Sequence, residues 1–318
     1  MHNNEEEFAD VTIDCRGEQL PQKTGKIALI DADTVVFASC SVLENIDELL
    51  PESMYTKEEW AGIIADPGYS EKDHTVSFMD IEEAITHSLE KIEYIMEHTG
   101  CVDFELHFTI GRESFPYTVS KDYKANRTKD KTRKAPYNLR ATKDAFCERY
   151  PNKVFAHTKQ EADHAVIAKK IADFDKYTLC AVDKDVLKAL PGKMFNYYQS
   201  ILYNIDMKWI ENTEEEAMKA YYLQTLTGDA GDGVIGLKGI GPAKAKKALA
   251  KCNTEEECWE AVVKMYEANG RDIIDAITNM RLVDMKQTYF NEDGDCIVTL
   301  WKPGYTLKER LHAPYGMG

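Results

Sequence analysis

The run from Leu226 to Leu249, LTGDAGDGVIGLKGIGPAKAKKAL, joins an acidic pair to a glycine-rich loop and then to a basic helix. Its glycines Gly236, Gly239 and Gly241 allow positive φ or close approach of the backbone. Pro242 suits the first turn of a helix, where its missing N–H costs little. No acid lies between Gly236 and Lys251, and this interval ends with or contains five lysines: Lys238, Lys244, Lys246, Lys247 and Lys251. Free amides, a helix N-terminus and these charges together predict a phosphate-binding loop.

Asp229 and Asp232 precede this loop and carry the opposite charge. Carboxylates so close to a phosphate site are favourable mainly when a divalent cation lies between them. Taken alone, the run fits a surface turn with a solvated helix equally well. The acids elsewhere in the chain decide between the two interpretations.

Other acids follow predicted strands or open a predicted helix. The apolar runs Ile27–Ile30 and Thr178–Val182 predict buried parallel strands. The first ends in Asp31 and Asp33, the second in Asp183 and Asp185, and a predicted helix over Gln160–Phe174 opens with Glu161 and Asp163. Because ligands collect at the carboxyl ends of strands in open α/β sheets, we expect these acids to lie near one another.

Together with the acids before the glycine loop, eight carboxylates are expected in one region: Asp31, Asp33, Glu161, Asp163, Asp183, Asp185, Asp229 and Asp232. Like charges that close raise one another's pKa unless a counter-charge is present. Oxygen ligands favour Mg²⁺ or Mn²⁺ over zinc, and two such ions would hold a phosphodiester for in-line attack. For a single Asp-x-Asp a helix cap or a turn is the simpler interpretation, and only the joint arrangement favours metal.

The remaining pattern is that of an α/β protein with a helical C-terminal part. We expect a helix over Ile81–Thr99 stopped by Gly100, a strand over Phe104–Ile110 and a short strand over Val154–Ala156. Residues 44–76 resemble a loop-like insertion, with Pro51, Pro67 and Gly68. From Met207 to Asp284 the chain is expected to be largely helical, with a short strand within Asp295–Leu300.

Composition bounds the class of protein. A chain of 318 residues can bury a hydrophobic core large enough to fold without disulfides or structural metals. Its eight cysteines form no CxxC pair, so we predict reduced thiols, no disulfide and no zinc site. No apolar stretch could span a bilayer, and the start MHNNEEEFAD has no signal-peptide pattern. We expect an intracellular, cytoplasmic, monomeric protein without membrane contact, located in the host cytoplasm if a phage encodes it.

The charge distribution is more informative than the net charge of −16. Residues 119–143 hold nine Lys or Arg against two Asp, a local balance of +7. A solvated loop is the simple alternative for this segment. This segment and the lysines that follow the glycine loop are two basic regions in an otherwise acidic chain. Such a chain can bind a polyanion along its basic surface while the acidic surface repels it.

Five ordered blocks resemble the 5′ nuclease (flap endonuclease) family, in its bacterial or bacteriophage form and similar to the 5′ nuclease domain of DNA polymerase I. They are LIDAD, DYKANR, QEADHAV, AVDKDVL and the run that begins at Leu226, and they span about residues 27–250. The resemblance implies a PIN-like α/β core with a mainly parallel sheet flanked by helices, then a helix-three-turn-helix module. We therefore expect a polar N-terminal arm (1–25), a nuclease core (26–205) with a basic arch at about 119–143, and a DNA-binding region with a C-terminal extension (206–318).

The resemblance also implies roles for individual residues. Seven acids match metal ligands for two Mg²⁺ or Mn²⁺ ions: Asp31, Glu161, Asp163, Asp183, Asp185, Asp229 and Asp232. Lys124 and Arg127 match arch residues that hold the scissile phosphate, and Lys124 is the first candidate for neutralising transition-state charge. Expected DNA contacts are Tyr123, Lys131, Arg133, Lys134, Lys238, Gly239, Gly241, Lys244, Lys246 and Lys247. Tyr123 is expected either to stack on an unpaired base or to pack internally, and K⁺ at the glycine loop is a further expectation.

Two positions depart from the family pattern. The central block usually reads EADD, but here its last residue is His164, which we expect beside a ligand rather than on the metal. The strand before the basic segment usually ends in Asp, whereas here Thr109 stands and no acid follows until Glu113. Asp33 is an uncertain substitute, because it could equally cap the following helix.

The expected function is a metal-dependent 5′–3′ exonuclease or structure-specific flap endonuclease that hydrolyses DNA by a two-metal-ion mechanism. Its expected substrates are DNA with 5′ flaps, nicks or free 5′ ends, with RNA–DNA as a further candidate. Two alternatives stay open: a DNA-junction binding protein with reduced or absent catalysis, and a PIN-type ribonuclease.

Overall fold

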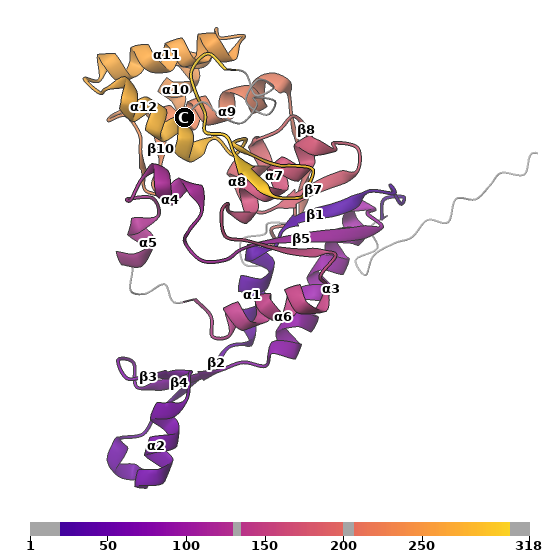
Figure 1. Ribbon diagram of the computed structural model, residues 1–318, viewed down its shortest axis with the longest axis vertical. Helices are drawn as coiled ribbons and strands as arrows, with labels where there is room; N and C mark the ends of the chain where they lie inside the picture. Colours follow the sequence, from indigo (N-terminus) through magenta and orange to yellow (C-terminus); the bar gives the residue numbers. More distant parts are fainter. Residues whose placement is uncertain (1–19, 130–134, 200–206, 306–318) are drawn as a thin grey trace, which may run out of the picture.

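A six-stranded sheet in the order β6-β5-β1-β7-β8-β9 forms the centre of the computed structural model, which describes residues 20–129, 135–199 and 207–305 (Figure 1). Five strands run parallel: β1 (Ile27–Asp31), β5 (Asp103–Thr109), β6 (Val154–His157), β7 (Tyr177–Ala181) and β8 (Gly192–Asn196). The last strand, β9 (Lys208–Asn212), pairs antiparallel with β8. The predicted α/β core with a mainly parallel sheet is confirmed, and the sheet continues past the expected boundary at residue 205.

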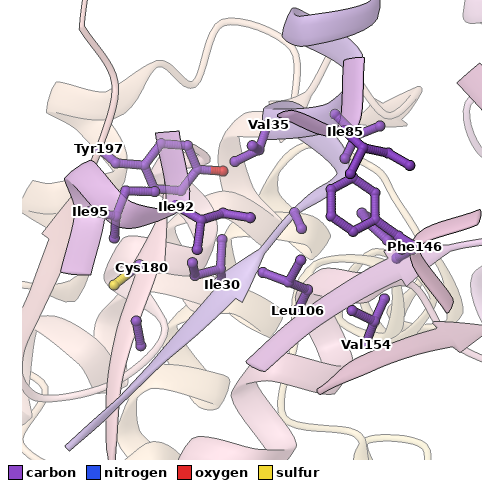
Figure 2. Packing of buried hydrophobic residues seen from close by; sticks show 14 of the residues in the cluster. Ile30, Val35, Ile85, Ile92, Ile95, Leu106, Phe146, Val154, Cys180 and Tyr197 are labelled. Carbon is purple, nitrogen blue, oxygen red and sulfur yellow. The ribbon is translucent and has the colours of Figure 1, made fainter. Parts of the chain in front are cut away.

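Helices cover both faces of this sheet. Because successive side chains of a strand point to opposite faces, Ile30 packs under α1 (Asp33–Leu43), α3 (Ile81–Thr99) and α6 (Leu139–Arg149). Figure 2 shows Ile30 and Leu106 of the sheet among side chains of these helices. Leu29 faces the other way, toward α7 (Ala162–Ala172) and α8 (Lys184–Lys188). The sheet is therefore the middle of three layers.

The predicted bounds of α3 are confirmed. Asp80 caps its first turn by accepting from the backbone N–H of Glu82, and the helix ends at Gly100, whose φ of 69° is left-handed. Every third or fourth apolar residue faces the core, so burial of one stripe holds this long helix against the sheet.

The C-terminal part has its own core. It consists of α9 (Glu214–Thr227), α10 (Pro242–Leu249), α11 (Glu255–Ala268) and α12 (Ile273–Val283), packed around side chains that include Leu226, Leu249 and Val262. Between α9 and α10 lies a small hairpin, β10 (Gly228–Asp229) with β11 (Val234–Ile235). After α12, β12 (Thr288–Phe290) and β13 (Cys296–Val298) form a second hairpin. The expected strand within Asp295–Leu300 is confirmed as β13.

Two short helices connect the sheet to the basic segment: α4 (Phe115–Val119) and α5 (Ala125–Lys129). Residues 130–134, in the middle of the expected arch, lie outside the described residues, as do 1–19 of the expected N-terminal arm and 306–318 of the expected extension. The part of the arch that is described runs from α4 to α5 and resumes before α6.

The expectation of a loop-like insertion at 44–76 is wrong. The chain there forms β2 (Asn45–Glu48), a 3₁₀ turn η1 (Glu52–Met54), α2 (Lys57–Ala65), β3 (Tyr69–Ser70) and β4 (Thr75–Phe78). The strands make a three-stranded sheet in the order β2-β4-β3. We call residues 45–78 the acidic lobe. In Figure 1 it stands away from the other elements, beyond the ends of α1 and α6.

The seven cysteines that the structure describes carry free thiols, and five of them are buried. Within the described ranges, none of the helices combines the length and the apolar character that a membrane crossing requires.

Candidate metal and phosphate site

One pocket of about 180 Å³ lies at the carboxyl ends of the parallel strands and gathers all eight predicted acids. β1 contributes Asp31, and α1 begins with Asp33. The turn after β7 contributes Asp183 and Asp185, and the start of α7 contributes Glu161 and Asp163. Asp229 and Asp232 reach the same pocket from the hairpin of the helical part. The fold thus brings together acids that lie up to two hundred residues apart.

Asp31 and Glu161 are the two buried acids of this group. Asp31 is 9% exposed, and its Oδ1 has no hydrogen-bond partner. Burial, followed by the charges of Asp33, Asp163 and Asp183, raises its pKa well above the usual range. Its backbone carbonyl accepts a hydrogen bond from the hydroxyl of Tyr197 at 2.7 Å, which fixes the end of β1.

Asp183 and Asp185 follow β7 and line the mouth of the pocket. Asp183 caps α8 by accepting from the backbone N–H of Asp185 at 2.7 Å. Partial enclosure and the charge of Asp183 raise the pKa of Asp185 to about 7. Gln224 of α9 donates to Asp185 Oδ2 at 2.8 Å and to Asp229 Oδ2 at 3.0 Å. This amide joins the acids of the sheet to those of the helical part.

His164 lies directly beside Asp163. Its Nδ1 is 2.8 Å from Asp163 Oδ1, and its ring packs edge-on against Phe115. Burial opposes ionisation of Asp163, but the charge and hydrogen bonds of His164 outweigh it and hold the pKa of Asp163 low. Burial likewise opposes protonation of His164, and the charge of Asp163 raises the pKa of His164. The contact fits the expected place of His164 beside a ligand.

Glu161, Asp163 and His164 also place one potential ligand atom each within 4.8 Å of one another, and they are the single such group in the described ranges. Burial and the charge of Asp163 raise the pKa of Glu161. We take the carboxylates as the primary donors, because hard Mg²⁺ prefers oxygen and Nδ1 of His164 is engaged with Asp163.

Thr109 stands at the end of β5, where an acid was expected. Its hydroxyl accepts from the backbone N–H of Ala162 at 2.9 Å, and its own N–H donates to both carboxylate oxygens of Asp33. Lys143 of α6 lies 2.6 Å from Asp33 Oδ1. Lys143 therefore neutralises Asp33, and the pair connects α6 to the end of β5. Because its charge is already paired, Asp33 does not simply replace the absent acid.

Lys124 points into the pocket from the segment before α5. Its Nζ lies 2.7 Å from both carboxylate oxygens of Glu161 and 3.9 Å from Asp232 Oδ2. Burial disfavours its charge, but Glu161 and the other acids outweigh this and raise its pKa. Its backbone has a left-handed φ of 53°, and its N–H donates to the carbonyl of Asp232 at 2.8 Å. An ammonium thus stands inside the acidic pocket.

The structure corrects one expectation, the stacking of Tyr123 on an unpaired base. Its side chain is buried at 3% exposure, and its hydroxyl donates to Glu161 Oε2 at 2.8 Å and to Asp232 Oδ2 at 3.1 Å. The ring packs against Tyr117 and joins the core of the helical part. The alternative of internal packing is the one that the structure shows.

Arg127 lies at the rim of the pocket. Its Nη2 is 2.6 Å from Asp232 Oδ1, and about half of the side chain is exposed. Gly233 allows the β10–β11 hairpin to lie against the basic segment. Its φ is 74°, and a Cβ there would lie 2.9 Å from the carbonyl oxygen of Asp122. Close backbone contact between the basic segment and the hairpin therefore completes the pocket.

The glycine loop lies apart from the acids, on the way to α10. Gly239 has a left-handed φ of 74°, and its carbonyl accepts from Lys244 Nζ at 2.9 Å. Gly241 precedes Pro242, the first residue of α10. The four lysines expected to contact DNA are all exposed: Lys238, Lys244, Lys246 and Lys247. Three other expected contacts, Lys131, Arg133 and Lys134, lie outside the described residues.

Two residues that bind acids of the pocket escaped the sequence analysis. Gln224 is one turn before the end of α9, and its place five residues ahead of Asp229 was the available signal. Lys143 lies on the buried side of α6, in the stretch counted only as basic. Neither belongs to a recognisable motif, because each reaches its acid through the packing of its helix.

The donor set fits divalent cations. It consists of carboxylate oxygens, including one buried oxygen of Asp31 without a partner. Burial, and after it mutual repulsion, raises the pKa values of several of these acids. A divalent ion would relieve that repulsion and supply the missing partner. The pocket therefore has the donor chemistry of a divalent-cation site, with Lys124 and Arg127 beside it.

No protein-family model matches the chain, and no curated protein matches its sequence. Similar solved structures include the flap endonuclease of bacteriophage T5 in a pseudo-enzyme–product complex with DNA and metal ions, with 17% identity over 63% of this chain and 80% of that chain and a TM-score of 0.49. The bacteriophage T5 5′-exonuclease with bound zinc has 18% identity over 63% and 81% of the two chains, with the same TM-score of 0.49.

The catalytic core of Rad2 in complex with a DNA substrate has 12% identity over 85% of this chain and 76% of that chain, with a TM-score of 0.43. The two T5 proteins are named as a flap endonuclease and a 5′-exonuclease. Likeness at this level of identity concerns the fold alone, so we derive the function from the residues of the pocket.

Proposed function

We propose that this protein is a divalent-metal-dependent 5′ nuclease that hydrolyses DNA phosphodiesters as a 5′–3′ exonuclease or flap endonuclease. The observation that carries the proposal is the single pocket in which acids from β1, α7, α8 and the β10–β11 hairpin meet Lys124 and Arg127. Carboxylates alone would repel a phosphate, and cations alone would not activate water, so the combination favours metal-assisted phosphodiester cleavage.

Seven acids would hold the ions: Asp31, Glu161, Asp163, Asp183, Asp185, Asp229 and Asp232. When bound, two Mg²⁺ or Mn²⁺ ions would supply a nucleophile at neutral pH and neutralise charge on the cleaved phosphate. Other side chains hold these carboxylates in place: Gln224 holds Asp185 and Asp229 together, and His164 holds Asp163.

Lys124 would exchange its contact with Glu161 for the scissile phosphate when substrate and ions enter the pocket. Its Nζ already lies among the acids, and its left-handed backbone is held by Asp232. Arg127, more exposed at the rim, is suited to the neighbouring phosphate. Behind them, the glycine loop and the lysines of α10 form a surface suited to the backbone of a duplex, the role expected of a helix-three-turn-helix module.

Incubation of the purified full chain with 5′-labelled flap, nicked-duplex and RNA substrates tests the proposal. We expect cleavage of flap and nicked DNA with Mg²⁺ or Mn²⁺ and none with EDTA. Asp293→Asn, an exposed acid in the β12–β13 turn, serves as a matched control for variants of the pocket acids and should cleave normally.

Each contrary outcome would indicate a different function for this protein. Flap DNA that is bound but stays intact with either ion would overturn the nuclease assignment in favour of a junction-binding protein. Thr109 stands at the end of β5, where the family pattern has an acid, and this difference keeps the second function in view. Preferential cleavage of RNA would instead indicate a ribonuclease.

A further inference from the structure

The acidic lobe is a folded unit with few of its side chains buried. Trp60 of α2 forms its centre, with ring centroids 5.6 Å from Tyr55, 6.1 Å from Tyr69 and 5.9 Å from His74. α2 begins with a capping box of Thr56 and Glu59 and buries none of its residues. The lobe contributes no residue to the pocket of acids. Its surface is therefore available for a role outside cleavage.

β2 is an edge strand of the lobe's sheet, and its free side presents unpaired backbone groups. The N–H of Leu49 donates to the carbonyl of His74 at 3.0 Å, so residue 49 faces β4. Alternate residues of an antiparallel strand face opposite ways, so the backbone groups of Asp47 face β4 and those of Ile46 and Glu48 face outward. All four residues of β2 are exposed.

The side chains around this edge combine apolar surface with negative charge. Ile46 is 59% exposed, and other exposed apolar side chains of the lobe are Leu50, Met54, Ile64 and Phe78. Residues 45–78 hold eight Asp or Glu against two Lys. Nucleic acid would be repelled by this charge. A second copy would place Asp47 and Glu48 against like charges, which is unfavourable between adjacent strands.

We propose that the outer edge of β2 is a docking site for an extended segment of a partner protein in which basic and apolar residues alternate. The segment adds a strand beside β2, and its backbone bonds to the outward N–H and C=O groups of Ile46 and Glu48. Its apolar side chains lie on the face of Ile46, and its basic side chains lie on the opposite face, where they pair with Asp47. This role is independent of cleavage in the pocket.

The first experiment compares two labelled peptides of about eight residues, the length of a moderate strand, by fluorescence anisotropy with the full chain. One alternates lysine and valine, and the other alternates glutamate and valine. We expect the lysine peptide to bind at least about tenfold more tightly. It should also protect the backbone amides of Ile46 and Glu48 from hydrogen exchange. Equal binding of the two peptides, or protection elsewhere only, would overturn the proposal.

Ile46→Pro tests the backbone contact directly. Proline is tolerated on an edge strand where its missing N–H faces solvent, so the β2–β4 pairing should survive while the outward donor is lost. We expect binding of the lysine peptide to weaken by about tenfold while cleavage of flap DNA, or its binding, stays unchanged. If peptide binding is unaffected by Ile46→Pro, strand addition at this edge is excluded.

The charge contribution is tested by Asp47→Lys with Glu48→Lys. Its matched control is Glu58→Lys with Glu71→Lys, which changes the charge of the lobe equally but away from β2. We expect the first pair to abolish binding of the lysine peptide and the control pair to retain most of it. An equal loss in both would show that the acids act only as a diffuse charge that keeps the edge from aggregating.

Discussion

Lys124 is the residue on which the proposed chemistry depends most. It combines a left-handed backbone with an ammonium group held between Glu161 and Asp232. Non-glycine residues in this conformation cost free energy and persist where the surroundings fix them, as the bond from its N–H to Asp232 does here. The left-handed backbone of Lys124 is therefore fixed by its contacts in the pocket and not by the intrinsic preference of lysine.

We expect Lys124→Ala to slow cleavage more than it weakens DNA binding. Loss of one charge aimed at the reacting phosphate should reduce kcat by about 10²-fold, whereas the remaining basic residues keep most of the affinity. Single-turnover cleavage and flap-DNA binding in Ca²⁺ measure the two effects separately. A variant that loses affinity and rate in equal proportion would show that Lys124 only attracts the substrate.

For Asp183→Asn we expect cleavage to fall to background with little loss of DNA binding. The change removes an expected metal ligand and also relieves repulsion from Asp163 and Asp232 in the metal-free pocket. The metal-free variant should therefore melt at a higher temperature than the wild type. Wild-type turnover in Mg²⁺ would refute the ligand role, and Asp293→Asn is the control for loss of one negative charge.

At the scale of elements, the hairpin β10–β11 connects the helical part to the basic segment. Gly228 and Gly233 permit this, the first by close approach to Gly236 and the second by close approach to Asp122. Arg127 and Lys124 then contact Asp232 from the other side. The pocket wall is thus a joint between two elements that are far apart in sequence.

Gly233→Ala tests this joint. Alanine at a φ of 74° is strained by about 1–2 kcal/mol, and its Cβ would also press on the carbonyl of Asp122 and shift Lys124. We expect lower stability and a larger drop in kcat than in affinity. Gly270→Ala is a matched control, because its φ of 70° carries the same strain while nothing lies within 4 Å of the added Cβ. Equal cleavage by the two variants would contradict the prediction.

The exposed helix α10 carries a separate prediction. Lys244→Ala with Lys246→Ala should weaken duplex binding and lower the slope of log affinity against log salt by about two, since each phosphate contact contributes slightly less than one. Cleavage at saturating DNA should change little. An unchanged slope, measured by anisotropy over a range of salt, would remove α10 from the binding surface.

Much of this arrangement of elements could be predicted from sequence, because the decisive signals are local. Ile27–Asp31 and Tyr177–Ala181 are short apolar strands followed by acids, and the stop at Gly100 needs only its own backbone. The acidic lobe was missed because its strands are short and exposed and α2 has no buried stripe. Its order comes from one aromatic cluster around Trp60, which no periodicity reveals.

The site shows the same division between local and long-range information. The acids were found because strand ends meet at one edge of a parallel sheet. Tyr123 was ambiguous, since its burial depends on Glu161 and Asp232, 38 and 109 residues away. Gln224 and Lys143 are ordinary helical residues until the packing of α9 and α6 brings them to Asp185 and Asp33.

For the whole molecule, the cluster of acids implies that stability depends on pH and on metal. Asp185 has a pKa of about 7 in the fold against 3.8 for an unperturbed side chain. The metal-free fold thus holds a proton that the unfolded chain releases, so its stability should fall as pH rises from about 4 to about 7. Divalent ions bind the ionised acids and should oppose the fall.

Thermal unfolding in EDTA across that pH range checks the direction. We expect Tm to decrease toward neutral pH, the decrease to be smaller in Asp185→Asn, and Mg²⁺ to raise Tm most near pH 7. Asp293→Asn should follow the wild type. A Tm in EDTA that rises steadily through the same range would contradict the raised pKa of Asp185.

The contact between the basic segment and the β10–β11 hairpin also orders events during synthesis. Asp229 and Asp232 complete the pocket, and the N–H of Lys124 has no carbonyl to bond until residue 232 exists. A ribosome must therefore have made nearly three quarters of the 318 residues before the last wall of the pocket can form. Shorter chains would carry the strand-end acids without Asp229 and Asp232. The nuclease activity that we propose would therefore be absent until the helical part had been made and had folded.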